Sequence, residues 1–335
     1  MRKPRVSVLL PVFRAEHTLG AALRSLLCQS HGDFECIVVD DGSPDGSLAV
    51  AAEAARRDPR ITLISEPHAG IVAALQRGLQ ACRGELVARM DADDLAHKDR
   101  LRLQVEHLDR HPTLGAVGAH VWMFPRVGMS DGLRAYEVWL GSLTDAESVR
   151  RDRFVECPIV HPTLLCRREL LLGYGYRKTP WHEDYDLVLR MLEAGEALGV
   201  VPKKLLGWRD GPDRLTRRAP ESSRERLVAC KAHYLARGFL AGADDYVLWG
   251  YGDTGRMLAR ALLAEGKRPS HILELHPRRL GQRILGAPVL RPDALPQGAR
   301  RRIVVSVAGS GAREDVRRTA ARLALVEGRA FVVAA

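Results

Sequence analysis

The first ninety residues alternate between short apolar runs and segments with helical periodicity. In the segment from His17 to Gln29, leucines recur on one face of a helix. Strands that are apolar on both faces and separated by helices belong to a mostly parallel sheet that helices cover on both sides. The pattern therefore predicts an α/β fold with strands at Val6–Leu10, Cys36–Val39, Ile61–Ile64 and Leu86–Ala88, and further helices at Ser47–Arg57 and Ile71–Cys82.

The middle of the chain, from Gly115 to Leu170, is less regular. We expect loops here, which either expose aromatic side chains to hold a ligand or fold over a small core of their own. The aromatic residues are Trp122, Phe124, Tyr136 and Trp139. Periodicity returns near Asp186–Ala194 and at Leu227–Arg237, which predicts a helix in each place.

A second strand and helix series begins after Gly242, with a helix that ends near Glu265. Its predicted strands are Tyr246–Trp249, Ile272–Glu274, Ile303–Val307 and Phe331–Val333. We therefore expect two domains, residues 1–240 with the connecting helix and residues 241–335 as a smaller Rossmann-like α/β domain.

The net charge of +10 favours anionic partners, which include nucleic acid, a membrane surface and phosphorylated small molecules. Aromatic residues make up only 5% of the chain and do not interleave with its arginine runs, so nucleic acid is not an expected partner. Peripheral contact with an anionic membrane is favoured instead.

The predicted location is the cytoplasm, where the protein is either free or in peripheral contact with the inner face of the membrane. No apolar run approaches the ~18 residues of a membrane span. The start, Met1 to Pro4, leads into a short apolar run without a cleavage site.

Acidic residues follow two of the predicted strands, and ligands of parallel sheets bind beyond the carboxyl ends of the strands. Asp40 and Asp41 follow the second strand, where a carboxylate can accept the N3–H of uracil or thymine. The alternative is an Asx turn in which Gly42 supplies a positive φ.

The second group, Asp91, Asp93 and Asp94, places three carboxylates within four residues. Their repulsion is costly unless a cation neutralises it, and oxygen ligands suit Mg²⁺ or Mn²⁺. The alternative is a helix start with Asp94 as its cap. We assign Asp91 and Asp93 to a metal site.

Five segments give the chain a specific resemblance to the inverting family 2 glycosyltransferases, which have the GT-A fold and use nucleotide-sugar donors. They are VSVLLPVF, VVDDGSPDGS, RGELVARMDADD, HPTLLCRRE and EDYDLVLR, in the family's order, and the likeness runs from Val6 to about Thr216.

The resemblance implies roles for residues at the matching positions. Asp93 would ligate the metal, and Asp91 would face the ribose or diphosphate. The remaining nucleotide-sugar-binding positions are Pro11, Val12 and Phe13 in the nucleoside pocket, Glu16, and Asp41 on the pyrimidine. Phe13-Arg14 stands where the family usually has Tyr-Asn, and the Gln-x-x-Arg-Trp motif of processive synthases is absent, so we expect a non-processive enzyme.

Glu183 and Asp184 open a predicted helix, where acidic residues often only complement the helix dipole. An inverting transfer needs one carboxylate to take the proton of the acceptor hydroxyl. By the resemblance, Asp184 is the base. Glu183 is the alternative base, and if Asp184 is the base, Glu183 would orient the acceptor.

Three further residues match motifs near the substrates. His161 either binds a substrate or is a hydrogen-bonded structural residue. Arg209 and Arg214 lie in a segment that resembles the family's closing loop. The two arginines either clamp the diphosphate or belong to a solvated loop. The histidine usual in that loop is missing.

A glycine-rich turn, Gly250, Gly252 and Gly255, lies between a strand and a helix, and Glu274 ends the next strand. This context indicates nucleotide binding at the helix N-terminus. The region resembles the Rossmann-like N-terminal domains of bacterial sugar acyltransferases. The alternative is a scaffold for homodimerisation or partner docking.

Together these features predict a Mn²⁺- or Mg²⁺-dependent inverting glycosyltransferase. It would move one sugar from a UDP-sugar, or a dTDP-sugar, to a hydroxyl of a glycan or lipid-linked acceptor in surface-glycan assembly. The alternative is a catalytically silent nucleotide-sugar sensor or scaffold.

Overall fold

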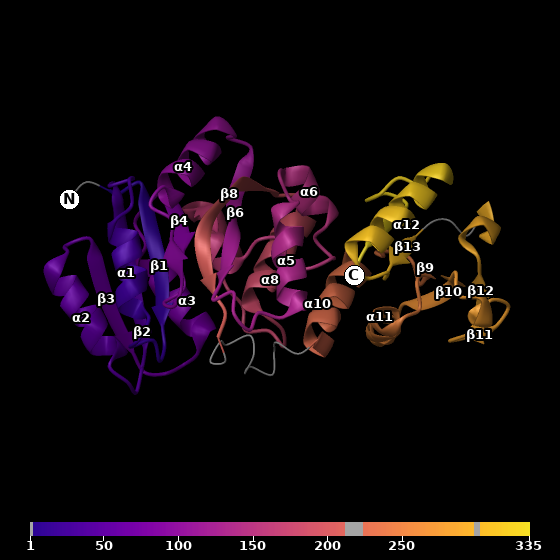
Figure 1. The fold of residues 1–335 in the computed structure, drawn as a ribbon, viewed down its shortest axis with the longest axis horizontal. Coiled ribbons are helices and arrows are strands. Elements are labelled where there is room, and N and C mark those ends of the chain that lie inside the picture. The colour runs from indigo at the N-terminus through magenta and orange to yellow at the C-terminus, as the bar shows by residue number, and fades with distance from the viewer. Residues whose placement is uncertain (1–2, 212–223, 298–301) are drawn as a thin grey trace. The chain divides into compact units, whose positions relative to one another are not determined.

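An eight-stranded mixed sheet organises the first part of the chain (Figure 1). The computed structural model describes residues 3–211, 224–297 and 302–335. In spatial order the strands are β3 (Ile61–Glu66), β2 (Phe34–Asp41), β1 (Val6–Val12), β4 (Leu86–Arg89), β7 (Leu165–Arg167), β6 (Leu114–Phe124), β8 (Ala197–Arg209) and β5 (Leu95–Ala96). β1 pairs in parallel with β2 and β4, β2 with β3, and β6 with β8, whereas β7 and β5 run antiparallel to their neighbours.

Helices between the strands cover this sheet. α3 packs on β1 and β2, while α4 and α5 pack on β6. The helical elements are α1 (Leu19–Leu27), α2 (Ser47–Arg57), α3 (Ile71–Ala81), α4 (Arg100–Arg110), α5 (Asp131–Gly141), α6 (Ala146–Arg151), η1 (His161–Thr163), α7 (Arg168–Tyr174) and α8 (Glu183–Glu193). Every residue of β1 and β2 is buried, because both strands are central and apolar side chains point to both faces.

The predicted α/β class with a mostly parallel sheet is confirmed, as are the four predicted strands of the first ninety residues. The prediction of loops between Gly115 and Leu170 was wrong. Trp122 and Phe124 lie on the long strand β6, and Tyr136 and Trp139 lie on α5. The glycine and alanine residues that weaken the strand pattern of β6 are buried where neighbours pack closely.

A second sheet of six strands organises the C-terminal part of the chain. Its order is β11 (Arg283–Ile284), β12 (Ala287–Leu290), β10 (Arg268–Leu273), β9 (Asp245–Trp249), β13 (Ile303–Val305) and β14 (Phe331–Val333), parallel except for the β11–β12 pair. The helical elements are α10 (Arg224–Arg237), α11 (Asp253–Ala264), η3 (Pro277–Arg279), η4 (Pro292–Ala294) and α12 (Ser310–Arg322). This is the Rossmann-like α/β unit expected from the sequence.

Contacts group the chain into two compact units. The first comprises Met1–Arg150, Ile159–Thr179 and Glu183–Arg214, and the second comprises Arg151–Pro158, Pro180–His182 and Leu215–Ala335. This grouping places α10 with the second unit. Independent folding on either side of residue 240 stays a prediction.

Candidate active site

The candidate site lies at one edge of the large sheet, where three parallel strands end. In the strand register Val12 of β1 pairs with Asp40 of β2, and Leu9 of β1 pairs with Arg89 of β4. The segments that follow these strands therefore begin at the same edge. They carry Phe13, the Asp41–Gly42 turn and the acidic group that starts at Asp91.

The two aspartates that end β2 have different partners. Asp41 accepts hydrogen bonds from the backbone N–H groups of Ala69, at 2.8 Å, and Gly70, at 3.0 Å. Asp40 is fully buried, and one of its oxygens accepts from the backbone N–H of Ser43. Its other oxygen, Oδ1, has no hydrogen-bond partner among the described residues.

Phe13 follows β1 and is partly exposed, while Pro11 and Val12 are buried within the strand. The ring of Phe13 stacks on the imidazole of His68, with centroids 4.2 Å apart and planes 16° apart. His68 Nδ1 lies 2.9 Å from an Asp41 carboxylate oxygen. The sequence prediction did not include His68, which precedes α3.

Glu16 lies beside this pocket but interacts with the neighbouring loop. Its carboxylate accepts the backbone N–H of Gly46 at 2.7 Å, just before α2, and faces His17. A role for Glu16 in nucleotide-sugar binding stays a prediction.

The acidic group after β4 brings three carboxylates close together. One carboxylate oxygen from each of Asp91, Asp93 and Asp94 lies within 4.8 Å of the other two. Asp91 and Asp93 are partly exposed, and Asp94 is buried. Carboxylate oxygens are the ligand type that Mg²⁺ and Mn²⁺ prefer, so these three side chains could hold such an ion.

The alternative in which Asp94 caps the next helix is wrong. α4 begins at Arg100 with Asp99 as its N-cap residue. Asp94 instead accepts the backbone N–H of Arg209 at 2.8 Å, because Leu95–Ala96 form the edge strand β5 beside β8.

Arg209 supports the acidic turn from β8. Its Nε donates to the backbone carbonyl of Asp93 at 2.7 Å, and its guanidinium lies over the ring of Phe124. These contacts hold Arg209 next to the predicted metal site. A diphosphate contact by Arg209 stays a prediction, and Arg214 lies outside the described residues.

A buried arginine, Arg89, pairs with the acidic group that follows β4. Its side chain is 4% exposed and pairs with Asp91. Burial acts to lower the pKa of Arg89, but Asp91, Tyr176 and Glu183 outweigh burial, so the pKa is raised on balance. Arg89 therefore stays positively charged among these groups.

His161 links Tyr176 to the predicted catalytic pair. Its Nε2 lies 3.1 Å from the Tyr176 hydroxyl, and its Nδ1 lies 3.6 Å from Glu183. Burial raises the pKa of the Tyr176 hydroxyl far above its ordinary value, so this phenol stays neutral. Both Glu183 and Asp184 are partly exposed at the first turn of α8.

Arg89, Tyr176 and His68 are site residues that the sequence reasoning missed. Arg89 had a detectable signal, since it is a charged residue at the end of an apolar strand, two residues before the acidic group. Tyr176 and His68 had none, because their partners are distant in the sequence.

The glycine-rich turn lies between β9 and α11, as predicted. Gly250 has a φ of +97°, and a Cβ on Gly255 would overlap the carbonyl oxygen of Gly250. Glu274 accepts from the backbone N–H of Leu275 at 2.9 Å and from Arg279 at 2.7 Å. Burial raises the pKa of Glu274, but these hydrogen bonds lower it on balance. Nucleotide binding here stays a prediction.

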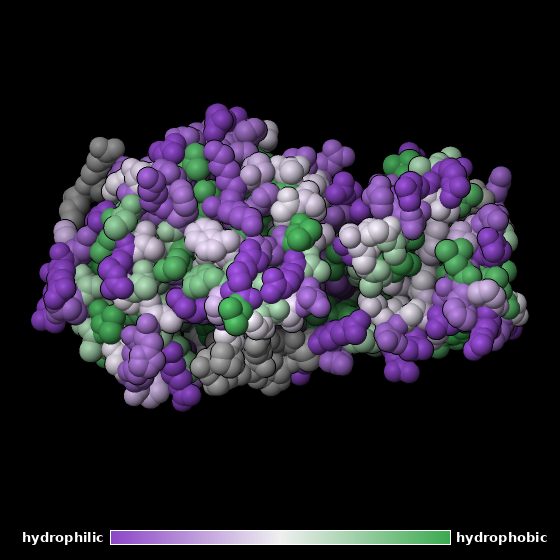
Figure 2. All heavy atoms as spheres, in the orientation of Figure 1, coloured by the Kyte–Doolittle hydropathy of each residue, from purple (hydrophilic) through white to green (hydrophobic). Residues whose placement is uncertain are grey.

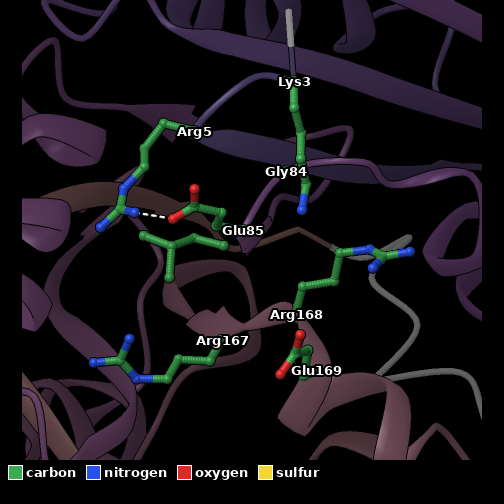
Figure 3. Close-up of a pocket in the computed structure, with 8 residues that line it drawn as sticks. Lys3, Arg5, Gly84, Glu85, Arg167, Arg168 and Glu169 are labelled. Atoms are coloured by element: carbon green, nitrogen blue, oxygen red, sulfur yellow. Dashed lines mark hydrogen bonds and ion pairs between the residues drawn. The ribbon is translucent and has the colours of Figure 1, made fainter.

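A hollow of about 290 Å³ opens elsewhere in the first unit (Figure 3). Arg5 and Glu85 form an ion pair within it, and Arg167 and Arg168 approach from β7 and α7. Glu85 precedes β4, whereas Asp91 follows it. The hollow therefore lies at the opposite edge of the sheet from the candidate site.

One face of the molecule is largely polar. Hydrophilic residues dominate the face drawn in Figure 2, and hydrophobic ones occur there in small groups. Within residues 3–211, 224–297 and 302–335, every helix is too short or too polar to cross a membrane.

Comparisons with known proteins find glycosyltransferases. A family model described as glycosyl transferase family 2 matches residues 7–171. EpsE of Bacillus subtilis (strain 168), a protein named as a glycosyltransferase, is 32% identical over 222 residues, which cover 64% of this chain and 77% of EpsE. The amylovoran biosynthesis glycosyltransferase AmsE of Erwinia amylovora is 29% identical over 249 residues, which cover 72% of this chain and 91% of AmsE.

A solved structure is similar in fold. S. aureus TarS (residues 1–349), in complex with UDP-GlcNAc, aligns with a TM-score of 0.56 at 18% identity, covering 77% of this chain and 71% of that one. This likeness confirms the predicted GT-A fold class.

Proposed function

Since this chain belongs to glycosyl transferase family 2 and is a glycosyltransferase, we propose that it moves one sugar from a nucleotide-diphosphate sugar to a hydroxyl acceptor with inversion. The observation that carries this proposal is the acidic group Asp91, Asp93 and Asp94. Arg89 pairs with Asp91 of this group, and its guanidinium also feels the charge of Glu183, which begins the helix that holds Asp184.

The nucleoside of the sugar donor would bind at Phe13 and Asp41. An aromatic ring can stack on a flat base, and a carboxylate beside it can accept a hydrogen bond from a ring N–H of that base. Uracil and thymine both have such an N–H, so a UDP-sugar is favoured and a dTDP-sugar is the alternative. The fold likeness to TarS, described with UDP-GlcNAc, agrees with this choice.

Asp93 and Asp91 would hold the divalent cation, Mn²⁺ or Mg²⁺, that the donor set suits. When bound, such an ion neutralises the charge that develops on the departing diphosphate. Arg209 would keep the acidic turn in place through its contact with the carbonyl of Asp93.

Asp184 would act as the general base. Its carboxylate takes the proton of the acceptor hydroxyl while that oxygen forms a bond to C1 of the sugar. The bond from C1 to the diphosphate oxygen breaks on the opposite face, which inverts the anomeric centre. Glu183, faced by His161, would orient the acceptor, and it is the alternative base.

The setting of the reaction follows from the family and the charge. We expect a non-processive enzyme of surface-glycan assembly. The name of AmsE, an amylovoran biosynthesis glycosyltransferase, is consistent with this setting. Its acceptor would be a glycan or a lipid-linked hydroxyl. The net charge of +10 would favour peripheral contact with an anionic membrane at the cytoplasmic face. The C-terminal glycine turn would bind a second nucleotide or support a homodimer.

A screen of nucleotide-sugars tests the proposal. The protein is stripped of metal with a chelator, and nucleotide diphosphate release is measured with added Mn²⁺, first without and then with candidate acceptors. We expect Mn²⁺-dependent release that an acceptor increases, and NMR of the product should show an inverted anomeric centre. Binding of nucleotide-sugar without turnover under every condition would favour the sensor alternative.

A further inference from the structure

The segment between β3 and α3 brings a histidine into the nucleoside pocket. The imidazole of His68 lies against the face of Phe13, 4.2 Å away between centroids. Its Nδ1 lies 2.9 Å from Asp41 Oδ2 and 3.1 Å from the Asp41 carbonyl oxygen. One side chain therefore contacts both groups that the proposed nucleoside site uses.

The backbone around His68 is held independently of its side chain. The N–H groups of Ala69 and Gly70 donate to the Asp41 carboxylate. Gly42, with a φ of +64°, allows the close approach, because a Cβ there would lie 2.6 Å from the backbone nitrogen of His68. The side chain of His68 is 55% exposed, so its imidazole can rotate toward solvent while the loop stays in place.

These contacts imitate those of a pyrimidine base. A flat ring stacks on the aromatic side chain, and a ring nitrogen lies within hydrogen-bonding distance of the carboxylate. A third ring cannot enter between Phe13 and His68, because they are already at stacking distance.

We propose that His68 occupies the base subsite before the nucleotide binds and must leave it for the nucleotide to bind. This inference rests on the proposed function through the roles of Phe13 and Asp41. His68 then competes with the sugar donor, and the observed affinity for the nucleotide is reduced by the fraction of molecules in which the subsite is open. The opposite role, in which His68 contacts the bound base, predicts the opposite effect of its removal.

Calorimetric titration with UDP and Mn²⁺ separates the two roles in the full chain. We expect His68→Ala to bind UDP about five- to tenfold more tightly than the wild type, since a competing contact is removed. His111→Ala, which removes another imidazole at the end of α4, should leave the affinity unchanged. Unchanged or weaker UDP binding by His68→Ala would overturn the proposal.

A spectroscopic measurement gives a second readout. With ¹⁵N-labelled histidine, the imidazole signal that is missing from the His68→Ala spectrum should shift when UDP saturates the wild type. A His68 signal that does not move in saturating UDP would also overturn the proposal.

Two results separate this inference from the proposed function. Phe13→Leu should weaken UDP binding in both the wild-type and the His68→Ala backgrounds, which tests the base subsite itself. If neither wild type nor His68→Ala binds any nucleotide diphosphate, the proposed function fails along with the inference. If the wild type binds UDP and only the His68 effects are absent, the inference alone fails.

Discussion

Asp91 and Asp93 are two residues apart but have different surroundings. Asp91 pairs with the buried guanidinium of Arg89, so part of its negative charge is already balanced. The backbone carbonyl of Asp93 accepts from Arg209, which fixes the turn, while its side chain is partly exposed. Asp93 is the position that the resemblance to the family assigns to the metal, so its removal tests the assignment directly.

Asp93→Ala should abolish metal-dependent transfer and leave the fold intact, because it removes an oxygen ligand from a partly exposed turn. Nucleotide diphosphate release is measured against Mn²⁺ concentration with chelator-stripped protein, and circular dichroism checks the fold. Full activity of the variant at ordinary Mn²⁺ concentrations would contradict the metal assignment.

Asp184→Asn should keep the affinity for the sugar donor and lose turnover, since an amide preserves the shape but cannot accept the proton. The loss in kcat should be about 10²- to 10⁴-fold, with little change in the KM for the sugar donor. Glu183→Gln is the matched variant at the neighbouring position. If Glu183→Gln is inactive and Asp184→Asn turns over normally, the two roles must be exchanged.

At the scale of elements, a buried carboxylate joins the strands that carry the site. Glu35 of β2 accepts from the Ser7 hydroxyl of β1 at 2.6 Å and from Arg83, just before β4, at 2.8 Å. Burial raises the pKa of Glu35, but the hydrogen bonds from Ser7 and Arg83 lower it on balance below its ordinary 4.5. The charged form is thus favoured in the folded protein.

Glu35→Gln should lower the free energy of unfolding by roughly 1–3 kcal/mol at pH 7. Because the folded-state pKa is lowered, this stabilisation is present above the unfolded pKa and is lost as the pH falls through the folded value. The difference between wild type and variant should therefore narrow below about pH 4.5. Urea denaturation at pH 7, 4 and 3 measures it.

Glu53→Gln on the exposed face of α2 is the control for this experiment, since Glu53 pairs only with surface arginines in the described structure. It should change stability little at any of these pH values. An equal loss for Glu35→Gln at all three would show that packing, and not ionisation, causes the effect.

At the scale of the whole molecule, residues 1–240 are predicted to carry out sugar transfer without the C-terminal part. The predicted residues of the transferase site that the structure describes all precede Gly211, within the first compact unit. A chain cut after residue 240 should therefore retain Mn²⁺-dependent transfer. Loss of transfer in a cut chain that is still folded would mean that the C-terminal part contributes to the acceptor site or to an active dimer.

The C-terminal part should fold alone and bind a nucleotide or nucleotide-sugar weakly. Calorimetry on residues 241–335 measures the binding, and Gly252→Val should remove it, because a side chain there would block the backbone N–H groups. A Cβ at Gly252 meets open space, so this change should not disturb packing. Absence of heat with UDP-sugars, dTDP-sugars and NAD would favour the scaffold alternative.

A longer segment, residues 224–335, is the matched control for that cut. It keeps α10, and the Phe239 carbonyl accepts a hydrogen bond from Arg302. If only the longer segment folds, the boundary predicted at residue 240 is misplaced.

The sequence alone determined the α/β class, four strands of the first ninety residues and the acidic positions after β2 and β4. These features depend on short-range periodicity, and on residues that adjoin one strand end. The long strand β6 could not be predicted in this way, since its buried glycine and alanine residues contribute to a strand only where neighbouring elements pack closely against them.

Only the tertiary structure decided which groups meet. Asp94 and Arg209 are 115 residues apart, and Phe13 meets His68 only because β1, β2 and β3 lie side by side. Arg89, Tyr176 and His161 come together where β4 ends beside η1. Strand order and register determine such pairings, and local patterns carry no information on either.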